Sequence, residues 1–479
     1  MEGLPGVLAN SVGGNCGSLG NLASGLLRRD NMFSGKKVIV LGGAKSGISA
    51  AQVLVKLGAE VTLTDIIPLH KMPEPDRSAL QQMNIRLVTG SHPVTLLKDA
   101  DLIVKNPGIS PEIDFLQSAK EFGVPWISEL ELAWLVTSAE VVAITGTNGK
   151  TTTTALTGEI LACASRPVAV GGNIGIPLTG ISFGKGPEWL LVVETSSFQL
   201  QDCYQLHPRV AIFTNLTPDH LNRHKSMENY LAAKMRLIQN QDSEDYAVIN
   251  LDDPILARQS FGRGQRIGFS LQPGEADCYT EDGWFCWRGA RVAPTSDLAL
   301  PGEHNLQNAL AAIAAAMVLK LQPEEISRGL RGFAGVEHRL EFAGEFRGIK
   351  FYNDSKATNP ESTSTALHSF AQKVLLLAGG YDKGAEFSGL VPLFQEKVKH
   401  LFTFGDTGEK IRQQVKAGGF AAVTPALDLA DAFRLASDMA EKGDIVLLSP
   451  ACASWDQYAN FEERGKHFKA LVNTWGGEV

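Results

Sequence analysis

A glycine-rich segment with a lysine at its end gives the strongest indication of chemistry. Residues 145–154 read TGTNGKTTTT and follow the apolar run VVAI. Glycines let backbone N–H groups converge on phosphate oxygens, the start of a helix adds positive potential, and Lys150 can reach the terminal phosphates. The spacing departs from GxxxxGK[ST], because Ile144 stands at the first glycine position, so an ordinary glycine turn is the competing interpretation. The strand–turn–helix context favours a phosphate site made of Gly146, Thr147, Asn148, Gly149, Lys150, Thr151 and Thr152, with Thr151 or Thr152 available to magnesium.

A second glycine turn, GGAKSG (42–47), follows the first apolar run of the chain. With Asp65 after the next run, it partly matches a dinucleotide-binding fingerprint. Ala44 stands where GxGxxG requires glycine, so nicotinamide binding is poorly supported. A nucleotide diphosphate can use the same turn, with Asp65 contacting a ribose or base. A purely structural turn fits this motif equally well.

Charged side chains follow two later apolar runs. Glu194 ends the run LLVVE, where a buried carboxylate needs a cation, and magnesium is the simplest candidate. His220 lies in TPDHLNRH (217–224) and is either a second metal ligand or a hydrogen-bonding residue. Lys234 lies in a helical stretch, where a lysine side chain ordinarily reaches solvent.

The last third of the chain repeats this placement of polar residues. Arg339, the segment DSKATN (354–359), Lys383 and Ser454 lie beside or after apolar runs. Lysine and arginine neutralise carboxylates and phosphates while hydroxyls orient them, so this set suits anionic substrates, although solvated loops are the alternative. GxSxG and HExxH do not occur, which argues against a serine hydrolase or a zinc protease.

Parallel sheets are the framework that would gather these residues. β-branched runs alternate with helical stretches, which places ligand groups at the carboxyl ends of strands. Strands are predicted at 37–42, 60–64, 101–105, 141–145, 189–194, 210–215, 349–354, 374–380, 400–405 and 444–450. Aromatic alternation over 277–292 predicts a small antiparallel insertion, and a buried helix is expected after Asn305.

The length of 479 residues predicts about three domains. We expect an α/β fold with a Rossmann-like domain at 35–132, a central P-loop ATPase domain with a mainly parallel sheet at 133–335, and a second Rossmann-like domain at 336–479. Residues 1–34 are rich in Gly, Ser and Asn and are expected to be a mobile extension, with Met32 a possible alternative start.

Composition excludes several classes of protein. A net charge of -8 argues against a general nucleic-acid binder. A mean hydropathy of -0.03, with no apolar stretch near the roughly 20 residues of a bilayer crossing, argues against membrane insertion. The six cysteines show no CxxC spacing, which suits a reducing cytoplasm.

Taken together, the motifs resemble the Mur ligases of peptidoglycan synthesis. The resemblance rests on TGTNGKTTTT (145–154), GGNIG (171–175), ETSSFQL (194–200), TPDHLNRH (217–224), AAK (232–234), PGEHNLQNALAA (301–312), EHRLE (337–341) and NDSKATNP (353–360). NDSKATN and SPACASWDQYANFEERG (449–465) are similar to the branch of the family that adds D-glutamate.

The resemblance implies a cytoplasmic, monomeric, ADP-forming ligase that joins D-glutamate to UDP-N-acetylmuramoyl-L-alanine through an acyl phosphate. It implies ATP and two Mg²⁺ ions, with Thr151, Glu194, His220 and a carbamylated Lys234 as metal ligands and Lys150, Glu194, His220 and Lys234 as catalytic residues. Further ATP contacts would be Asn173, Asn305, Asn308, Arg339 and Asp354. The UDP-substrate side would be Gly43, Ser46, Gly47, Asp65, Asn106, Gly108 and Ser196, and the D-glutamate side Lys356, Thr358, Lys383, Ser454 and Phe461.

Some features depart from the family pattern and leave alternatives open. Ile66 and Ile67 follow Asp65 where some relatives carry polar residues, and Asn106 stands where some carry serine. The nearest alternative is a sister ligase, either another Mur step or folylpolyglutamate synthesis. A nucleotide-sensing module without turnover and a nicotinamide oxidoreductase are alternatives from other classes.

Overall fold

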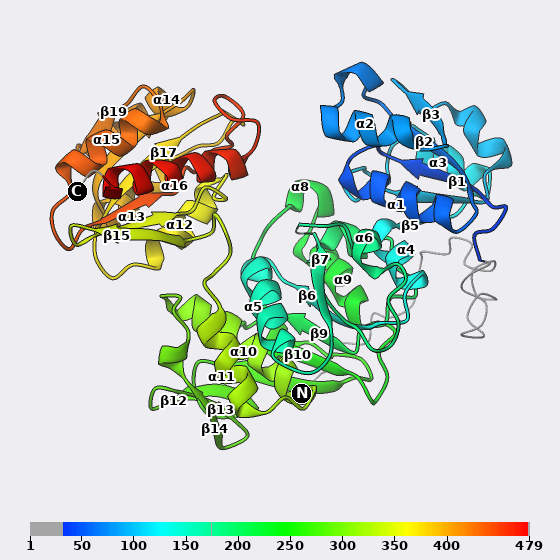
Figure 1. Ribbon diagram of the computed structural model, residues 1–479, viewed down its shortest axis with the longest axis horizontal. Helices are drawn as coiled ribbons and strands as arrows, with labels where there is room; N and C mark the ends of the chain where they lie inside the picture. The colour runs from blue at the N-terminus through cyan, green and yellow to red at the C-terminus, as the bar shows by residue number, and fades with distance from the viewer. Residues whose placement is uncertain (1–31, 174, 478–479) are drawn as a thin grey trace, which may run out of the picture. The chain divides into compact units, whose positions relative to one another are not determined.

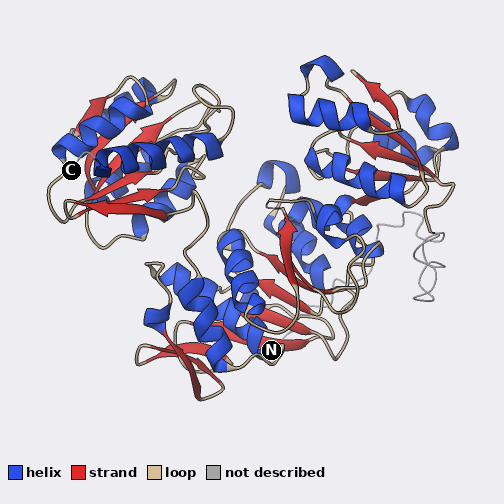
Figure 2. Cartoon of the chain, viewed as in Figure 1, coloured by secondary structure: helices blue, strands red, loops and turns tan. Residues whose placement is uncertain are grey.

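The computed structural model describes residues 32–173 and 175–477. Three sheets with helices alongside make up this part of the chain (Figures 1 and 2). The residues cluster into two compact units. Of the described residues, one unit contains 32–147, 166–173, 175–247 and 259–266, and the other contains 148–165, 248–258 and 267–477. The predicted extension falls on residues 1–31, outside the described part, apart from its last three residues, of which Phe33 is buried.

The first sheet is parallel and has the strand order β3-β2-β1-β4-β5. Its elements are β1 (Lys37–Leu41), α1 (Lys45–Lys56), β2 (Glu60–Asp65), α2 (Glu74–Gln82), β3 (Arg86–Thr89), β4 (Leu102–Lys105), α3 (Asp114–Glu121), β5 (Trp126–Ser128) and α4 (Glu129–Leu135). The chain leaves β1 first toward β2 and later toward β4. In open parallel sheets, ligands bind outside the strand ends at such a switch point.

Alternation within β1 explains why this strand is apolar from Val38 to Leu41. Val38 and Val40 belong to one buried cluster, and Ile39 and Leu41 belong to another. Successive side chains of a strand point to opposite faces, so each face of this sheet is covered. Phe33 packs into the same cluster as Val38.

The second sheet has the order β14-β13-β12-β11-β10-β9-β6-β8-β7. Its strands are β6 (Glu140–Thr145), β7 (Val168–Gly172), β8 (Leu190–Glu194), β9 (Val210–Phe213), β10 (Tyr246–Asn250), β11 (Gln265–Ser270), β12 (Cys278–Glu281), β13 (Trp284–Trp287) and β14 (Ala290–Pro294). The helices of this region are α5 (Lys150–Ala162), α6 (Leu178–Ser182), α7 (Ser197–Leu200), α8 (Leu221–His224), α9 (Met227–Met235), α10 (Glu303–Val318) and α11 (Pro323–Gly332).

Strands β7, β8, β6 and β9 run parallel, so their carboxyl ends share one edge of the sheet. Strand β13 is antiparallel to both β12 and β14, which confirms the predicted insertion. The helix expected after Asn305 begins slightly earlier, at Glu303, because its first turn follows directly on Gly302.

The third sheet has the order β15-β16-β20-β17-β18-β19. Its elements are β15 (Glu341–Phe346), β16 (Ile349–Asn353), α12 (Pro360–His368), β17 (Val374–Gly379), α13 (Val391–Lys397), β18 (Val398–Phe404), α14 (Gly408–Ala417), β19 (Val423–Pro425), α15 (Leu429–Met439), β20 (Ile445–Leu448) and α16 (Phe461–Gly477). Strands β16, β20 and β17 are parallel neighbours, so the loops that follow them lie side by side.

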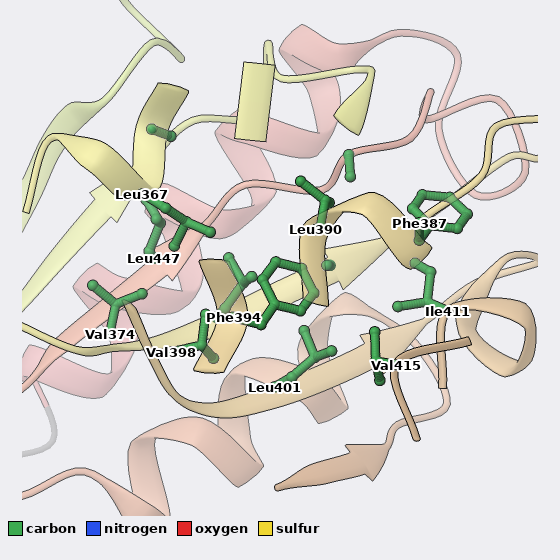
Figure 3. Close-up of a cluster of buried hydrophobic side chains, with 14 of the residues drawn as sticks. Leu367, Val374, Phe387, Leu390, Phe394, Val398, Leu401, Ile411, Val415 and Leu447 are labelled. Carbon is green, nitrogen blue, oxygen red and sulfur yellow. The ribbon is translucent and has the colours of Figure 1, made fainter. Parts of the chain in front are cut away.

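The core of this third sheet also has two faces. Val374 and Leu376 of β17 join the cluster drawn in Figure 3, where Phe394 and Leu401 also lie. Leu375 of the same strand packs into a separate cluster. The predicted α/β fold with mostly parallel sheets is therefore confirmed. Among the described residues, no helix combines the length and the apolarity needed to span a bilayer.

Candidate functional site

The glycine-rich loop leads from β6 into α5. Gly146 has φ 149° and Gly149 has φ 79°, and a side chain is strained in that conformation. A Cβ on Gly146 would lie 1.9 Å from Oγ1 of Thr214, and one on Gly149 would lie 2.3 Å from Oδ1 of Asn308. Gly149 occupies the N-cap position of α5 and brings no capping side chain of its own. The loop is therefore built to present a helix N-terminus to an anion.

A chain of buried amides supports α5. Thr153 Oγ1 donates to Asn308 Oδ1 at 3.1 Å, and Asn308 Nδ2 donates to Asn305 Oδ1 at 3.2 Å. Asn305 Nδ2 in turn donates to the carbonyl of Pro301 at 2.7 Å. These bonds join α5 to α10, whose packing together can be followed in Figure 1. Asn305 and Asn308, both predicted ATP contacts, thus hold the helix that carries Lys150.

Glu194 ends β8 and is 2% exposed. Its Oε1 accepts a hydrogen bond from Asn173 Nδ2 at 2.8 Å, and its backbone carbonyl accepts one from the Asn173 N–H at 2.9 Å. Its Oε2 is buried and has no hydrogen-bond partner within the described residues. Because a buried carboxylate oxygen is costly without a partner, a cation such as Mg²⁺ fits this position.

Lys234 is buried rather than solvated, which corrects the ordinary interpretation of a helical lysine. It is 2% exposed, and its Nζ donates to the carbonyl of Gly146 at 2.7 Å. Nζ also lies 4.5 Å from the centroid of the Tyr230 ring, and the Tyr230 hydroxyl lies 3.2 Å from Oγ1 of Thr147. Helix α9 therefore places Lys234 against Gly146 of the glycine-rich loop. Helical spacing alone did not reveal this, because the contact is tertiary.

His220 and His224 differ in their surroundings. His220 has φ 53° and its side chain is 51% exposed, with Nε2 3.4 Å from the Asp219 carboxylate. His224 is buried, and its Nε2 lies 2.9 Å from Oγ of Ser197. Burial lowers the pKa of His224, which favours the neutral form of its ring. His220 is thus the accessible imidazole of the pair.

The residues predicted for the UDP-linked substrate lie at the ends of β1, β2, β4 and β8. Each carboxylate oxygen of Asp65 accepts a backbone N–H, from Gly43 at 2.6 Å and from Ile67 at 2.8 Å. Asp65 is therefore partly committed to shaping the turn that precedes Ser46 and Gly47 in α1. Asn106 Oδ1 accepts the Gly108 N–H at 3.1 Å, and Ser196 forms a capping box with Gln199 at the start of α7.

Asp354 follows β16 and is buried. Its Oδ1 accepts the Leu340 N–H at 3.2 Å, and its Oδ2 accepts Oγ of Ser449 at 2.8 Å. Burial raises the pKa of this carboxyl to about 7, and the nearby charge of Arg339 opposes the rise. The Nε of Arg339 is buried and has no hydrogen-bond partner in the described part of the chain.

The remaining residues of the third sheet gather around its carboxyl edge. Lys356 Nζ lies 5.9 Å from the Phe461 ring centroid, and Lys383 Nζ lies 4.5 Å from the Trp455 ring centroid. Thr358 and Lys383 line a cavity of about 70 Å³ between the loops that follow β16, β17 and β20. Ser454, in the loop after β20, is 2% exposed.

Arg464 connects two of these loops and was not singled out from the sequence. It is fully buried, and its guanidinium donates to the carbonyl and the hydroxyl of Ser355 at 2.9 and 3.0 Å. It also donates to the carbonyls of Cys452 and Ala453 at 3.1 and 3.2 Å. Burial lowers its pKa to about 10, so it remains charged at neutral pH. An isolated arginine in a helical segment gave no signal of this role.

The raised pKa of Asp354 predicts a pH dependence of stability. Between its ordinary pKa of 3.8 and about 7, the folded chain retains a proton that the unfolded chain has released. This contribution to the free energy of unfolding is present below pH 3.8 and is lost as the pH rises toward 7. Urea unfolding at pH 5 and pH 7 should therefore show a larger loss for the wild type than for Asp354→Asn. Equal losses in both proteins would contradict the assignment.

Three Mur ligase domains match successive parts of the chain. The N-terminal domain of the MurD-like Mur ligases matches residues 36–128, the Mur ligase middle domain matches 144–316, and the glutamate ligase domain matches 338–452. A protein of Halalkalibacterium halodurans named UDP-N-acetylmuramoylalanine–D-glutamate ligase is 42% identical over 93% of this chain and 99% of its own length. A Staphylococcus haemolyticus protein of the same name is 40% identical over 90% of this chain and 96% of its own length.

Solved structures agree in fold. The UDP-N-acetylmuramate-alanine ligase of Thermotoga maritima superposes with a TM-score of 0.61 at 19% identity, covering 92% of this chain and 99% of that one. MurF of Acinetobacter baumannii gives a TM-score of 0.57 at 17% identity, covering 93% and 91%. The matches to all three domains, together with relatives above 40% identity over nearly the whole chain, place this protein in the Mur ligase family.

Proposed function

We propose that this protein is an ATP-dependent ligase that adds D-glutamate to UDP-N-acetylmuramoyl-L-alanine. The observation that carries the proposal is the burial of two ionisable side chains near the glycine-rich loop. Glu194 has a buried carboxylate oxygen without a hydrogen-bond partner among the described residues, and Lys234 donates to the Gly146 carbonyl of the loop. Strands β6 and β8 are neighbours, so this loop and Glu194 start from one edge of a sheet. The names of the close relatives support the choice of substrates.

The three matched domains suggest a division of labour. Residues 35–132 would bind the UDP-linked substrate, residues 133–335 would bind ATP, and residues 336–479 would bind D-glutamate. We propose a monomer that acts in the cytoplasm, where ATP and nucleotide-linked precursors are available. The extended run of matches along one chain supports a complete set of substrate sites within one copy.

The residues present suit two Mg²⁺ ions. Thr151, Glu194, His220 and Lys234 would hold them, with Lys234 carbamylated so that its end becomes a carboxylate. Bound Mg²⁺ would offset the charge that accumulates when two anions meet. A carbamate nitrogen keeps one N–H, so the bond from Lys234 to the Gly146 carbonyl can persist after modification.

The proposed reaction follows from the charges on the substrates and on these side chains. A carboxylate oxygen of the muramoyl-alanine would form a bond to the γ-phosphorus as the bond to the ADP oxygen breaks, giving an acyl phosphate. Lys150 would neutralise charge on the transferring group, with Asn173, Arg339 and Asp354 on the ATP side. The D-glutamate amine would attack the acyl carbon, release phosphate and lose its proton to form the amide. Lys356 and Lys383 would neutralise the D-glutamate carboxylates, with Thr358, Ser454 and Phe461 completing that side.

Phosphate release tests this function directly. With ATP, Mg²⁺ and UDP-N-acetylmuramoyl-L-alanine, we expect release with D-glutamate and a product of the corresponding mass. L-glutamate, L-lysine, diaminopimelate and no amino acid serve as parallel reactions and should give little release. Dependence on another amino acid would move the chain to a sister ligase, and nucleotide binding without release would favour a sensing module.

A further inference from the structure

A backbone loop after β4 is held by an arginine from the region of the second sheet. The loop, residues 106–109, contains Asn106 and Gly108, two predicted contacts for the UDP-linked substrate. Arg223 donates from Nη2 to the carbonyls of Pro107 and Ile109, both at 3.1 Å, and from Nη1 to the carbonyl of Gly108 at 3.2 Å. Three consecutive carbonyls therefore converge on one guanidinium. The side chain of Asn106 completes the turn through the Gly108 N–H.

The base of this loop is fixed independently of Arg223. Lys105 is fully buried, and its Nζ donates to the carbonyl of Ile109 at 2.9 Å and lies 3.0 Å from Oδ2 of Asp202. Trp126 Nε1 donates to the other oxygen of Asp202 at 2.9 Å. Because these bonds anchor the end of β4 and Ile109, removing Arg223 should release the middle of the loop without unfolding the sheet.

The Arg223 guanidinium also packs on Phe198, a ring that lies against His220 and His224. It lies 4.0 Å from the centroid of the Phe198 ring. The same ring lies 4.9 Å from His220 and 5.2 Å from His224, and it is stacked on His224 with an interplanar angle of 11°. Arg223 is also only three residues after His220 in the chain. One short segment, 220–224, therefore carries both the accessible imidazole and the group that holds the loop.

We propose that Arg223 is a positioning residue for the UDP-linked substrate, acting through the loop 106–109. This inference rests on the proposed function. Arginine suits the role because its planar fork of donors can serve several acceptors at once, whereas the ammonium of lysine is a single point charge. Arg223 fixes the backbone that carries Asn106 and Gly108, and it ties that backbone to the segment that begins at His220.

The test compares Arg223→Met and Arg223→Lys with a matched control, Arg236→Met. Arg236 is a half-buried arginine that donates to the carbonyl of Cys203 from Nε at 3.2 Å and from Nη2 at 2.8 Å, and its guanidinium lies 5.1 Å from the Tyr204 ring. Like Arg223, it donates to a backbone carbonyl and lies against an aromatic ring, and among the described residues its guanidinium makes no hydrogen bond to the loop 106–109. The KM values for the UDP-linked substrate, ATP and D-glutamate would be measured together with the melting temperature.

We expect Arg223→Met to raise the KM for UDP-N-acetylmuramoyl-L-alanine by roughly 10- to 100-fold. A change of that size is expected when the displaced loop no longer makes one or two charge-assisted hydrogen bonds to the substrate. The KM values for ATP and D-glutamate should stay within about twofold, since among the described residues the Arg223 guanidinium bonds to none of the predicted ATP or D-glutamate contacts. Arg223→Lys should lie between wild type and Arg223→Met, and Arg236→Met should keep the wild-type KM values.

Two results would overturn the inference. One is an unchanged KM for the UDP-linked substrate in Arg223→Met. The other is a parallel rise of all three KM values with a lower melting temperature, which would indicate a structural role only. If Arg223→Met does not fold, Arg223→Lys decides by the same KM pattern. The wild type in the same assay reports separately on the proposed function, because an absence of D-glutamate-dependent phosphate release there would refute the function itself.

Discussion

Lys150→Ala is expected to remove measurable turnover, a loss of about 1,000-fold or more, while the protein stays folded. Lys150 begins α5 directly after Gly149, whose left-handed conformation turns the chain into the helix. A fixed cation that faces a transferring phosphoryl group acts where charge develops, and one such cation contributes about 1,000- to 100,000-fold in phosphoryl transfer. Phosphate release measured with all substrates present would give the loss.

Folding of the Lys150→Ala protein can be checked separately from activity. Its circular dichroism and melting temperature should match the wild type, because the Asn308–Thr153 bond that supports α5 is unaffected. Lys416→Ala, at an exposed lysine in the last turn of α14, is the matched control and should keep full activity. A Lys150→Ala enzyme with near wild-type phosphate release would refute the phosphate role.

Lys234→Ala is the second change with a large expected effect. It removes the Nζ that donates to the Gly146 carbonyl and, in our proposal, the carbamate that holds a metal ion. Loss of one ligand at a metal-assisted phosphoryl transfer should cost several kcal/mol, or about 1,000-fold in rate. Short carboxylates such as formate or acetate should restore part of the activity, because they can supply the missing oxygen ligands.

Rescue by carboxylates has an internal control. Lys150→Ala should not respond to formate or acetate, since its missing group is a cation. Isotopically labelled bicarbonate should give a carbamate signal in the wild type that is absent from Lys234→Ala. Wild-type rates in Lys234→Ala, or a large loss without any rescue, would contradict the carbamate.

Much of the fold could be predicted from strand and helix periodicity. The runs at 38–41 and 374–378 are apolar at every position because each sheet is covered on both faces, and this continuity is visible in the sequence. The short strands β5 and β19 are missing from the predicted set. β5 is only Trp126–Ser128, and β19 is Val423–Pro425. Three residues carry too little periodicity for a pattern to stand out.

The residues of the candidate site could likewise be predicted only in part. Lys150, Glu194 and Asp354 could be predicted from local pattern, because they lie at a glycine-rich turn or at the end of a strand. The burial of Lys234 and the bonds made by Arg223 depend on segments far apart in the chain, such as 106–109 and 220–224. Charged side chains on short helices ordinarily face solvent, so only the tertiary structure shows that Lys234 is buried and that Arg223 bonds to the loop 106–109.

Arg464 has one more consequence, for the mobility of two loops that carry residues of the proposed D-glutamate side. A single buried cation bonds the loop after β16, through Ser355, and the loop after β20, through Cys452 and Ala453. If either loop moved away, the buried guanidinium of Arg464 would lose part of its hydrogen-bond acceptors. The free energy cost of a buried charge without acceptors is larger than the loss of an ordinary hydrogen bond. The two loops should therefore behave as one cooperative unit, with amide protons that exchange together rather than one loop at a time.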